Sequence, residues 1–223
     1  MKNTGMVKGL LIAGLMAGMA LPSMAVLTLP IADDAVTDAG LMRLGAGVTL
    51  ESDINLYGGR FTYGLADGIG LFGGGGIVDP DGPDSEPYFQ VGGQYTLPVY
   101  DLPFDLAVRG SFGMTSFDES SYGWKTEIDI WMLNFGLLAS TDVEMVTLYG
   151  YAGLSYQDYD YETTQTVTVG DRRVRQSFSG DDTETELAIG GGVLFPVNDQ
   201  ISFYGELMHI DDLFISLGGH LNF

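Results

Sequence analysis

The chain has 223 residues, with 30 acidic and nine basic side chains, 33 glycines, 12 tyrosines, 12 phenylalanines and no cysteine. This length fits one good-sized domain or two small ones. The excess of acidic residues argues against nucleic acid as a partner, because a nucleic-acid-binding surface needs positive charge against the phosphates. The absence of cysteine excludes disulfides, so backbone pairing and packing alone must stabilise the fold.

Residues 1–25 have the pattern of a cleaved export signal. Lys2 and Lys8 supply positive charge, residues 9–21 are apolar, and Ser23 and Ala25 are the small residues that a signal peptidase requires. A short membrane anchor is the alternative, but the apolar stretch is too short for one and no stop-transfer pattern follows. We therefore expect cleavage after Ala25.

Residues 26–41 lack the periodicity of a strand and contain the polar stretch DDAVTDAG. We expect a lead-in to the folded domain, with a helical turn capped by Asp33 or Asp34. Such a segment can also fold back and plug the interior of the domain, although none of its residues requires this.

From residue 42 to the end, apolar and polar residues alternate with the period of two that indicates β-strands with one apolar face. Ten segments show this pattern: residues 42–50, 54–65, 69–78, 88–97, 104–115, 125–139, 145–157, 183–195, 201–209 and 213–223. Most are 9 to 13 residues long. A tilted strand that crosses a bilayer needs roughly 9–11 residues, whereas strands in soluble sheets commonly have roughly 5–6.

Two further features favour a transmembrane barrel over a soluble sandwich. Short connections (LADG, LPVYDLP, STDVE and PVNDQ) alternate with longer ones (DPDGPDSEP, SFDESSYGW and residues 158–182), as in barrels with short periplasmic turns and long external loops. Aromatic residues on the apolar faces gather near the short turns, as in the girdle at a membrane boundary. They are Tyr63, Tyr95, Phe104, Phe195, Phe203 and Phe223.

We therefore predict an all-β fold in which residues 42–223 form a single antiparallel, up-and-down transmembrane β-barrel. The barrel has ten strands, with eight as the alternative, and both termini are periplasmic, so that residues 26–41 form a periplasmic lead-in. The sheet has to close, because lipid offers no hydrogen-bond partner to an unpaired strand edge.

One segment breaks the alternation. In residues 125–139, Ile130 lies on one parity, whereas Leu133 and Leu137 lie on the other. A β-bulge near Trp131 restores the register by adding one residue. The alternative is a strand that is apolar on both faces below that point.

Charged residues occur on the polar, inward faces of the expected strands: Arg43, Arg60, Arg109, Asp105, Glu127, Asp129, Glu184, Glu186 and Glu206. One interpretation is a charged pore constriction. The other, which we favour, is an internal salt-bridge network that plugs a narrow barrel, because buried charges are kept paired.

An acidic external loop is a weak candidate for a metal site. Asp79, Asp81, Asp84 and Glu86 place four carboxylates within eight residues, a density that a Ca²⁺ site requires. The spacing is not that of an EF-hand, and two prolines make the stretch a good turn. A solvated acidic loop is the simpler interpretation, with divalent cations as a possible partner.

The longest connection has strand character of its own. It alternates around Gly170-Asp171, a plausible two-residue turn, so we expect strands seven and eight to continue as a protruding hairpin. Arg172, Arg173 and Arg175 near its tip either bind the phosphates of lipopolysaccharide or another acidic ligand, or neutralise neighbouring carboxylates.

Catalysis has little support, and we expect neither a catalytic residue nor a cofactor. His209 beside Asp211 and Asp212 faintly resembles the Asp–His pair of the omptin proteases. The second pair of acids that such a protease needs is not identifiable on the facing strands.

These residues resemble the small bacterial outer-membrane β-barrel proteins of the opacity-protein and OmpA/OmpX-like group. The resemblance covers residue 42 to the end. It is carried by the export signal, by strand pairs such as INLYGGRFTYGLADGIGLFGG and FPVNDQISFYGEL, and by the final stretch LFISLGGHLNF. Well-known members have eight strands, whereas this sequence predicts ten.

The resemblance implies an integral protein of the bacterial outer membrane that contacts its lipid and lipopolysaccharide. It also implies that a terminal aromatic, here Phe223, is the assembly signal for the barrel-assembly machinery. We expect a non-enzymatic structural or surface-interaction role with acidic surface loops. A narrow passive channel for ions or small solutes is the alternative, and an outer-membrane hydrolase is the least favoured.

Overall fold

A computed structural model describes residues 32–52, 54–80, 84–121, 124–169 and 172–223. The expected export signal, residues 1–25, lies outside these ranges, and its cleavage stays a prediction. No helix in the described ranges is long and apolar enough to cross a membrane.

Ten β-strands form one closed barrel in the described residues. They are β1 (Met42–Leu50), β2 (Ile54–Ala66), β3 (Ile69–Pro80), β4 (Glu86–Thr96), β5 (Asp105–Ser121), β6 (Trp124–Val143), β7 (Val146–Val169), β8 (Arg172–Pro196), β9 (Ile201–Ile210) and β10 (Asp212–Asn222). Each strand pairs antiparallel with its neighbours in sequence, and β1 pairs with β10 to close the sheet. The predicted ten-stranded, up-and-down barrel is confirmed, and the eight-stranded alternative is wrong.

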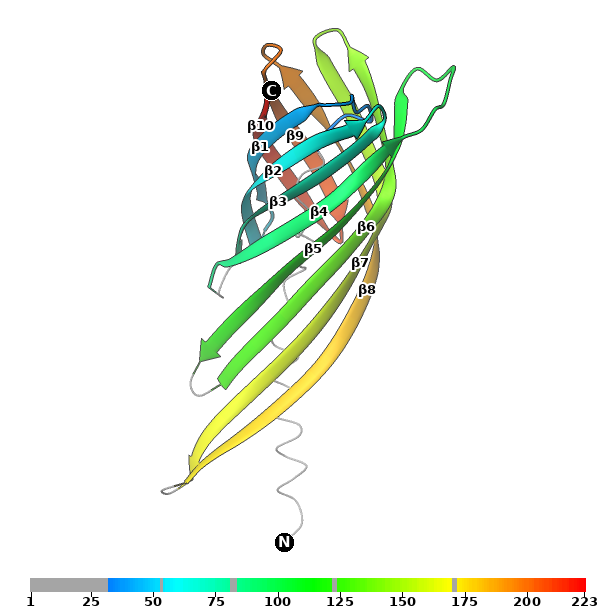
Figure 1. Cartoon of the computed structure of the whole chain (residues 1–223). Helices are drawn as coiled ribbons and strands as arrows, with labels where there is room; N and C mark the ends of the chain where they lie inside the picture. The colour runs from blue at the N-terminus through cyan, green and yellow to red at the C-terminus, as the bar shows by residue number, and fades with distance from the viewer. Residues whose placement is uncertain (1–31, 53, 81–83, 122–123, 170–171) are drawn as a thin grey trace.

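The barrel has two unlike ends. The four turns β2–β3, β4–β5, β6–β7 and β8–β9 lie at one end, together with the start of β1 and the end of β10, where Phe223 N donates to Met42 O at 2.9 Å. We name this the short-turn end, which is uppermost in Figure 1. All six aromatic residues expected in the girdle are more than a third exposed there or in the adjoining turns.

At the opposite, long-strand end, β5 to β8 project well beyond the rest of the sheet (Figure 1). They have 17, 20, 24 and 25 residues, whereas the other strands have 9 to 13. The predicted protruding hairpin of strands seven and eight is confirmed by pairing that continues to Val169 and Arg172. Its turn, residues 170–171, lies outside the described residues.

The stretch SFDESSYGW is not the loop that the sequence suggested. Most of it extends β5 and β6, which stay paired as far as Ser121 and Trp124. The reason is that the β7–β8 hairpin prolongs the sheet and offers β6 a partner beyond the barrel. Phe117, buried on the inward face, packs into the apolar cluster of the lumen.

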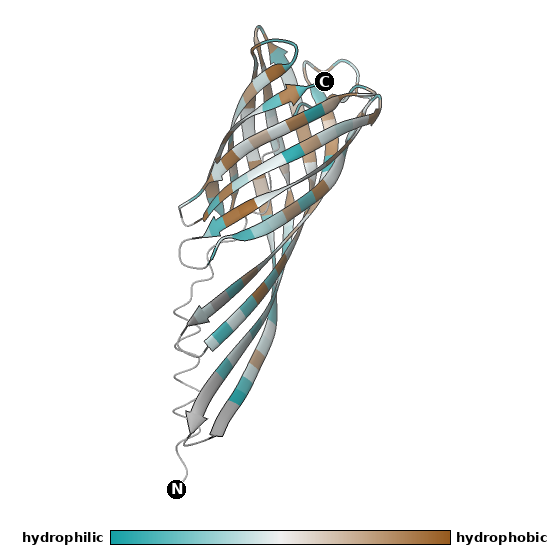
Figure 2. Cartoon of the chain, turned by 60° about the vertical axis from the view of Figure 1, so that its left-hand side comes forward, coloured by the Kyte–Doolittle hydropathy of each residue, from teal (hydrophilic) through white to brown (hydrophobic). Residues whose placement is uncertain are grey.

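The expected bulge near Trp131 is wrong. Strand β6 keeps one register against β5 and β7 along its whole length. Ile130 is buried and faces inward, whereas Leu133 and Leu137 are exposed on the outer face. The parity of the apolar residues changes because the surroundings of the two faces change. In the projecting sheet the exposed outer face carries Glu127 and Asp129, whereas along the barrel it carries Leu133 and Leu137. Hydrophilic and hydrophobic residues follow one another along the strands in both parts (Figure 2).

The outer wall of the barrel is a belt of exposed apolar side chains on all ten strands. Phe89 and Phe135 are each 61% exposed, and residues such as Leu154, Leu187 and Leu213 exceed half. A soluble monomer rarely exposes a continuous apolar surface of this extent. Inside, the half of the lumen near the long-strand end holds an apolar cluster that includes Leu56, Tyr88 and Met208.

Glycines on the inward faces make room for aromatic rings. A Cβ atom built on Gly47 or Gly218 would lie 2.0 or 2.4 Å from the Tyr204 hydroxyl. These positions therefore accept no larger residue while the Tyr204 ring lies across the lumen. Tyr149 crosses Gly192 in the same way.

Candidate functional site

The segment that precedes β1 enters the lumen at the short-turn end. We name residues 32–41 the plug segment. Its backbone is bound by the barrel wall: Gly64 N donates to Leu41 O at 2.8 Å, Gly68 N donates to Thr37 O at 2.7 Å, and Ala35 N donates to Ser140 Oγ at 2.9 Å. Asp38 and Ala39 are exposed at the rim, whereas Ala32, Asp33 and Ala35 are buried.

The expected helical turn at Asp33 or Asp34 is wrong, because the described part of this segment contains no helical residue. Wall side chains satisfy its backbone instead. Gln94 Nε2 donates to Asp34 O at 3.0 Å and to Thr37 Oγ1 at 2.9 Å, and Thr96 Oγ1 donates to Ala35 O at 2.6 Å. The segment folds back into the interior of the barrel, which is the position expected of a plug.

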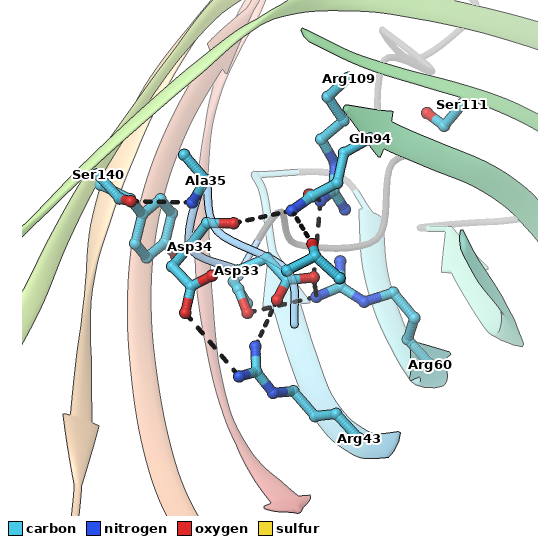
Figure 3. A network of polar contacts seen from close by, with 12 residues as sticks. Asp33, Asp34, Ala35, Arg43, Arg60, Gln94, Arg109, Ser111 and Ser140 are labelled. Carbon is cyan, nitrogen blue, oxygen red and sulfur yellow. Dashed lines mark hydrogen bonds and ion pairs between the residues drawn. The ribbon is translucent and has the colours of Figure 1, made fainter. Parts of the chain in front are cut away.

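Three arginines from three strands converge on the carboxylate of Asp33 (Figure 3). Arg43 of β1 contacts Oδ1, whereas Arg60 of β2 lies 3.3 Å and Arg109 of β5 lies 3.6 Å from Oδ2. The Asp33, Arg60 and Arg109 side chains are no more than 6% exposed. A buried charge cluster of this kind is tolerated only when its members are paired, and Asp33 is the anion that all three lumenal arginines share.

Neighbouring wall residues hold the arginines in place. Arg109 Nη1 donates to Gln94 Oε1 at 2.8 Å, and its guanidinium lies 4.1 Å from the ring centre of Phe72. The guanidinium of Arg60 lies 5.5 Å from the same ring. Both distances suit a cation–π interaction.

A carboxylate on the opposite wall binds the deepest described residue of the plug segment. Glu206 Oε2 accepts from Ala32 N at 3.0 Å and from the Tyr149 hydroxyl at 2.7 Å. Together with Asp33, this contact ties the plug segment to both sides of the lumen.

The two adjacent aspartates of the plug segment differ in their electrostatics. Burial acts to raise the pKa of Asp33, but the charges of Arg43, Arg60 and Arg109 outweigh it and hold the pKa below its ordinary value. Burial, and then the neighbouring Asp33 charge, raises the pKa of Asp34 to about 7, although Arg43 Nη2 lies 4.0 Å from Asp34 Oδ2.

The raised pKa of Asp34 predicts a pH-dependent stability. The folded state binds the Asp34 proton more tightly than the unfolded chain, so this stability is fully present below about pH 4 and is lost as the pH rises towards about 7. We expect Asp34→Asn to remove that slope. The free energies of unfolding from urea titrations at about pH 5 and about pH 8 should therefore differ by roughly 1–3 kcal/mol less in the variant than in the wild type. An unchanged difference would contradict the prediction.

The nine charged residues expected in the lumen do not form one network. Arg43, Arg60, Arg109 and Glu206 line the lumen around the plug segment. Asp105 is exposed at the start of β5, at the short-turn rim. Glu184 and Glu186 have the inward parity but lie at the long-strand mouth, beyond the last β8–β9 pair at Ile189.

Glu127 and Asp129 were expected in the lumen, and this is wrong. Both are exposed on the outer face of the projecting sheet, opposite Glu162 and Asp160 of β7. The assumption of a bulge inverted their parity. A groove of about 360 Å³ on this sheet has mainly acidic lining residues: Glu127, Asp129, Asp160, Glu162 and Asp181.

The remaining candidates that the structure describes lie at or near the surface. Asp81 and the side chains of Arg172 and Arg173 lie outside the described residues, and Arg175 is exposed and donates to Thr164 Oγ1 at 3.4 Å. Among Asp79, Asp84 and Glu86, the described members of the acidic loop, Asp79 accepts from Ser85 Oγ at 2.5 Å. The described residues contain no group of three side chains suited to a metal ion. His209 Nδ1 lies 3.2 Å from the backbone carbonyl of Asp212.

Sequence reasoning missed the central role of Asp33, together with Gln94, Ser140 and Thr96. The sequence contained one indication of this role. Two of the arginines expected in the lumen, Arg43 and Arg60, have no acidic residue near them in sequence among those expected in the lumen. The stretch DDAVTDAG directly precedes β1 and supplies the missing carboxylate.

The fold places the chain in the class of closed, antiparallel, up-and-down β-barrels, and the solved structures similar to it include small outer-membrane barrels. The outer membrane protease OmpT of Escherichia coli matches with a TM-score of 0.53 and 11% identity, over 88% of this chain and 99% of that one. Ail, the attachment invasion locus protein of Yersinia pestis, matches with a TM-score of 0.41 and 16% identity, over 83% and 99%.

The translocator domain of the autotransporter NalP from Neisseria meningitidis matches with a TM-score of 0.49 and 11% identity, over 96% of each chain. No protein-family model matches the sequence, and no curated protein matches it either. At such identities, a likeness to solved structures is one of fold alone.

Proposed function

We propose that the protein is an integral, non-enzymatic barrel of the bacterial outer membrane whose lumen is closed by its own plug segment. The single observation that carries this proposal is the Asp33 carboxylate, held by Arg43, Arg60 and Arg109 inside the barrel. A narrow passive channel needs an open path at this level. The plug segment and the side chains that bind it lie inside the barrel at this level, which supports a closed lumen.

The outer wall supports the membrane assignment. Its exposed apolar belt matches hydrocarbon, and exposed aromatic residues gather at the short-turn end as at a membrane boundary. Short turns characterise the periplasmic side of such barrels, so we place the short-turn end in the periplasm and the projecting sheet outside the cell. Phe223, beside Met42 at this end, is the proposed assembly signal for the barrel-assembly machinery.

The projecting sheet supports a surface-interaction role. It carries the acidic groove outside the apolar belt. At this level we expect lipopolysaccharide and its divalent cations to be the contact partners. An enzymatic role has weaker support. His209 has an exposed side chain, and in the described residues its hydrogen bond joins it to a backbone carbonyl rather than to a carboxylate.

The closed lumen predicts that the wild-type protein conducts no steady current. Purified protein should migrate differently on a gel with and without boiling, which shows that the barrel is folded, and it should then leave a planar bilayer silent. A known porin, reconstituted in parallel, controls for insertion. Steady single-channel currents from folded wild-type protein would refute the closed barrel and favour the channel.

A further inference from the structure

We propose that Arg43, Arg60 and Arg109 form a binding site for a small carboxylate, and that Asp33 occupies it as a ligand from the same chain. A carboxylate solute that enters from the short-turn end takes this place when the Asp33 carboxylate is withdrawn. This inference rests on the proposed closed barrel and adds the chemical class of its ligand.

The cationic site belongs to the barrel wall and not to the plug segment. Arg43 Nε donates to Asn222 Oδ1 at 2.9 Å, and Arg109 is held by Gln94 and Phe72. These contacts are made by wall residues alone, so they persist without Asp33. The guanidiniums of Arg43 and Arg109 are therefore pre-organised around the position of its carboxylate, which lowers the cost of binding another one. Arg60 also donates to Ala32 O of the plug segment at 3.3 Å, and this contact does not involve the Asp33 side chain.

The charges around the site favour an anion. Three arginines face Asp33, with Asp34 4.0 Å from Arg43 and with Glu206 and His220 also nearby. When Asp33 is removed, three arginine cations face the two carboxylates of Glu206 and Asp34, which leaves a net positive charge. A buried positive cluster of this kind binds a counter-anion, because an uncompensated buried charge is strongly unfavourable.

The geometry favours a carboxylate over a spherical anion. Arg43 contacts Oδ1 of Asp33, whereas Arg60 and Arg109 contact Oδ2. Two oxygens in one plane thus receive guanidinium groups from two directions, which one chloride ion cannot reproduce.

The space around the site limits the ligand while Asp33 is present. A neighbouring cavity of about 10 Å³, lined by Ala32, Arg60, Tyr204 and His220, is about the volume that one water occupies. A solute can therefore bind only in the volume that the Asp33 carboxylate occupies, once that carboxylate is absent. The Asp33→Ala substitution removes a carboxylate group, which has about the size of formate.

The test is chemical rescue of Asp33→Ala in the full-length protein, folded in detergent. At a formate concentration ten times its Kd, we expect the thermal midpoint to rise by roughly 3–6 °C. Formamide, the neutral isostere, and chloride at the same ionic strength should give no comparable rise. Asp33→Asn keeps the volume filled by an amide and should not be rescued.

Two further variants decide whether any rescue is specific. Asp33→Ala with Arg60→Gln and Arg109→Gln lacks the site and should not respond to formate, and Asp38→Ala, at the exposed rim, should behave as wild type. Equal effects of formate, formamide and chloride, or rescue that survives the two arginine changes, would overturn the carboxylate site. Where Asp33→Ala folds poorly, refolding yield on the boiled-against-unboiled gel replaces the midpoint in the same comparison.

The outcome is separable from that of the proposed function. Steady currents from the wild-type protein would refute the proposal of a closed barrel, but they would not bear on rescue by formate. A wild type that conducts no current, together with no rescue of Asp33→Ala by formate, would refute the carboxylate site alone.

Discussion

Asp33→Ala should lower the free energy of unfolding by about 3–5 kcal/mol, since removing one partner from a buried charge cluster leaves the others uncompensated. Asp33 accepts hydrogen bonds from Arg43 and Arg60 and forms an ion pair with Arg109, and both Arg60 and Arg109 are buried. Urea unfolding in detergent micelles, followed by tryptophan fluorescence, measures the change. We expect it to be among the largest effects of any single substitution in this chain.

Asp38→Ala is the matched control for this variant. Asp38 belongs to the same segment but is exposed at the rim, and surface substitutions away from specific contacts usually change stability by less than about 0.5 kcal/mol. A loss for Asp33→Ala no larger than that of the control would show that the arginines do not depend on the Asp33 carboxylate.

Gly64→Ala should drive the plug segment out of its position. A Cβ atom at residue 64 would lie 1.9 Å from the carbonyl oxygen of Asp38 and 3.2 Å from the Cβ atom of Leu41. The closer atom belongs to the backbone, so a change of rotamer cannot relieve the clash. Because the chain has no cysteine, a single Ala35→Cys substitution reports the position of the segment through its reaction with a maleimide.

Ala35 is fully buried inside the barrel. We expect its cysteine to react at least about tenfold faster in the Gly64→Ala background, which corresponds to a shift of ~1.4 kcal/mol. Gly73→Ala is the control on the neighbouring strand, because a Cβ atom there meets only ordinary contacts at 3.8 Å. Equal labelling rates in the two backgrounds would mean that the segment tolerates the Gly64 side chain.

The strands could be predicted from the sequence because the barrel wall separates the lumen from an apolar exterior, so that inward and outward residues alternate in character. Strand β1 covers residues 42–50 as expected, since Leu44 and Val48 face outward while Gly45 and Gly47 make room for ring atoms inside. The same rule failed on β6. The N-terminal half of β6 lies in the projecting sheet beyond the apolar belt, so Ile130 is buried on the inward face while Asp129 is exposed on the outer face.

The meeting point of the charges could not be predicted from the sequence. Arg43 and Arg60 lie on the paired strands β1 and β2, whereas Arg109 lies on β5, and only the registers between the strands place all three at one level. The plug segment has no periodicity, so its position depends on side chains of the wall. Gln94 and Ser140, which bind its backbone, look like ordinary inward-facing polar residues in the sequence.

The position of the plug segment has a consequence for how the barrel forms. The chain runs without a break from Ala39 into β1, and β1 meets β10 at the seam where the sheet closes. Through Asp33 and Ala32, the same segment binds β1, β2 and β5 and also β9 on the other side of that seam. The segment thus connects, from inside the barrel, the strands on both sides of the β1–β10 pairing that closes the sheet. We therefore expect the docking of residues 32–41 and the closure of the barrel to be coupled in folding.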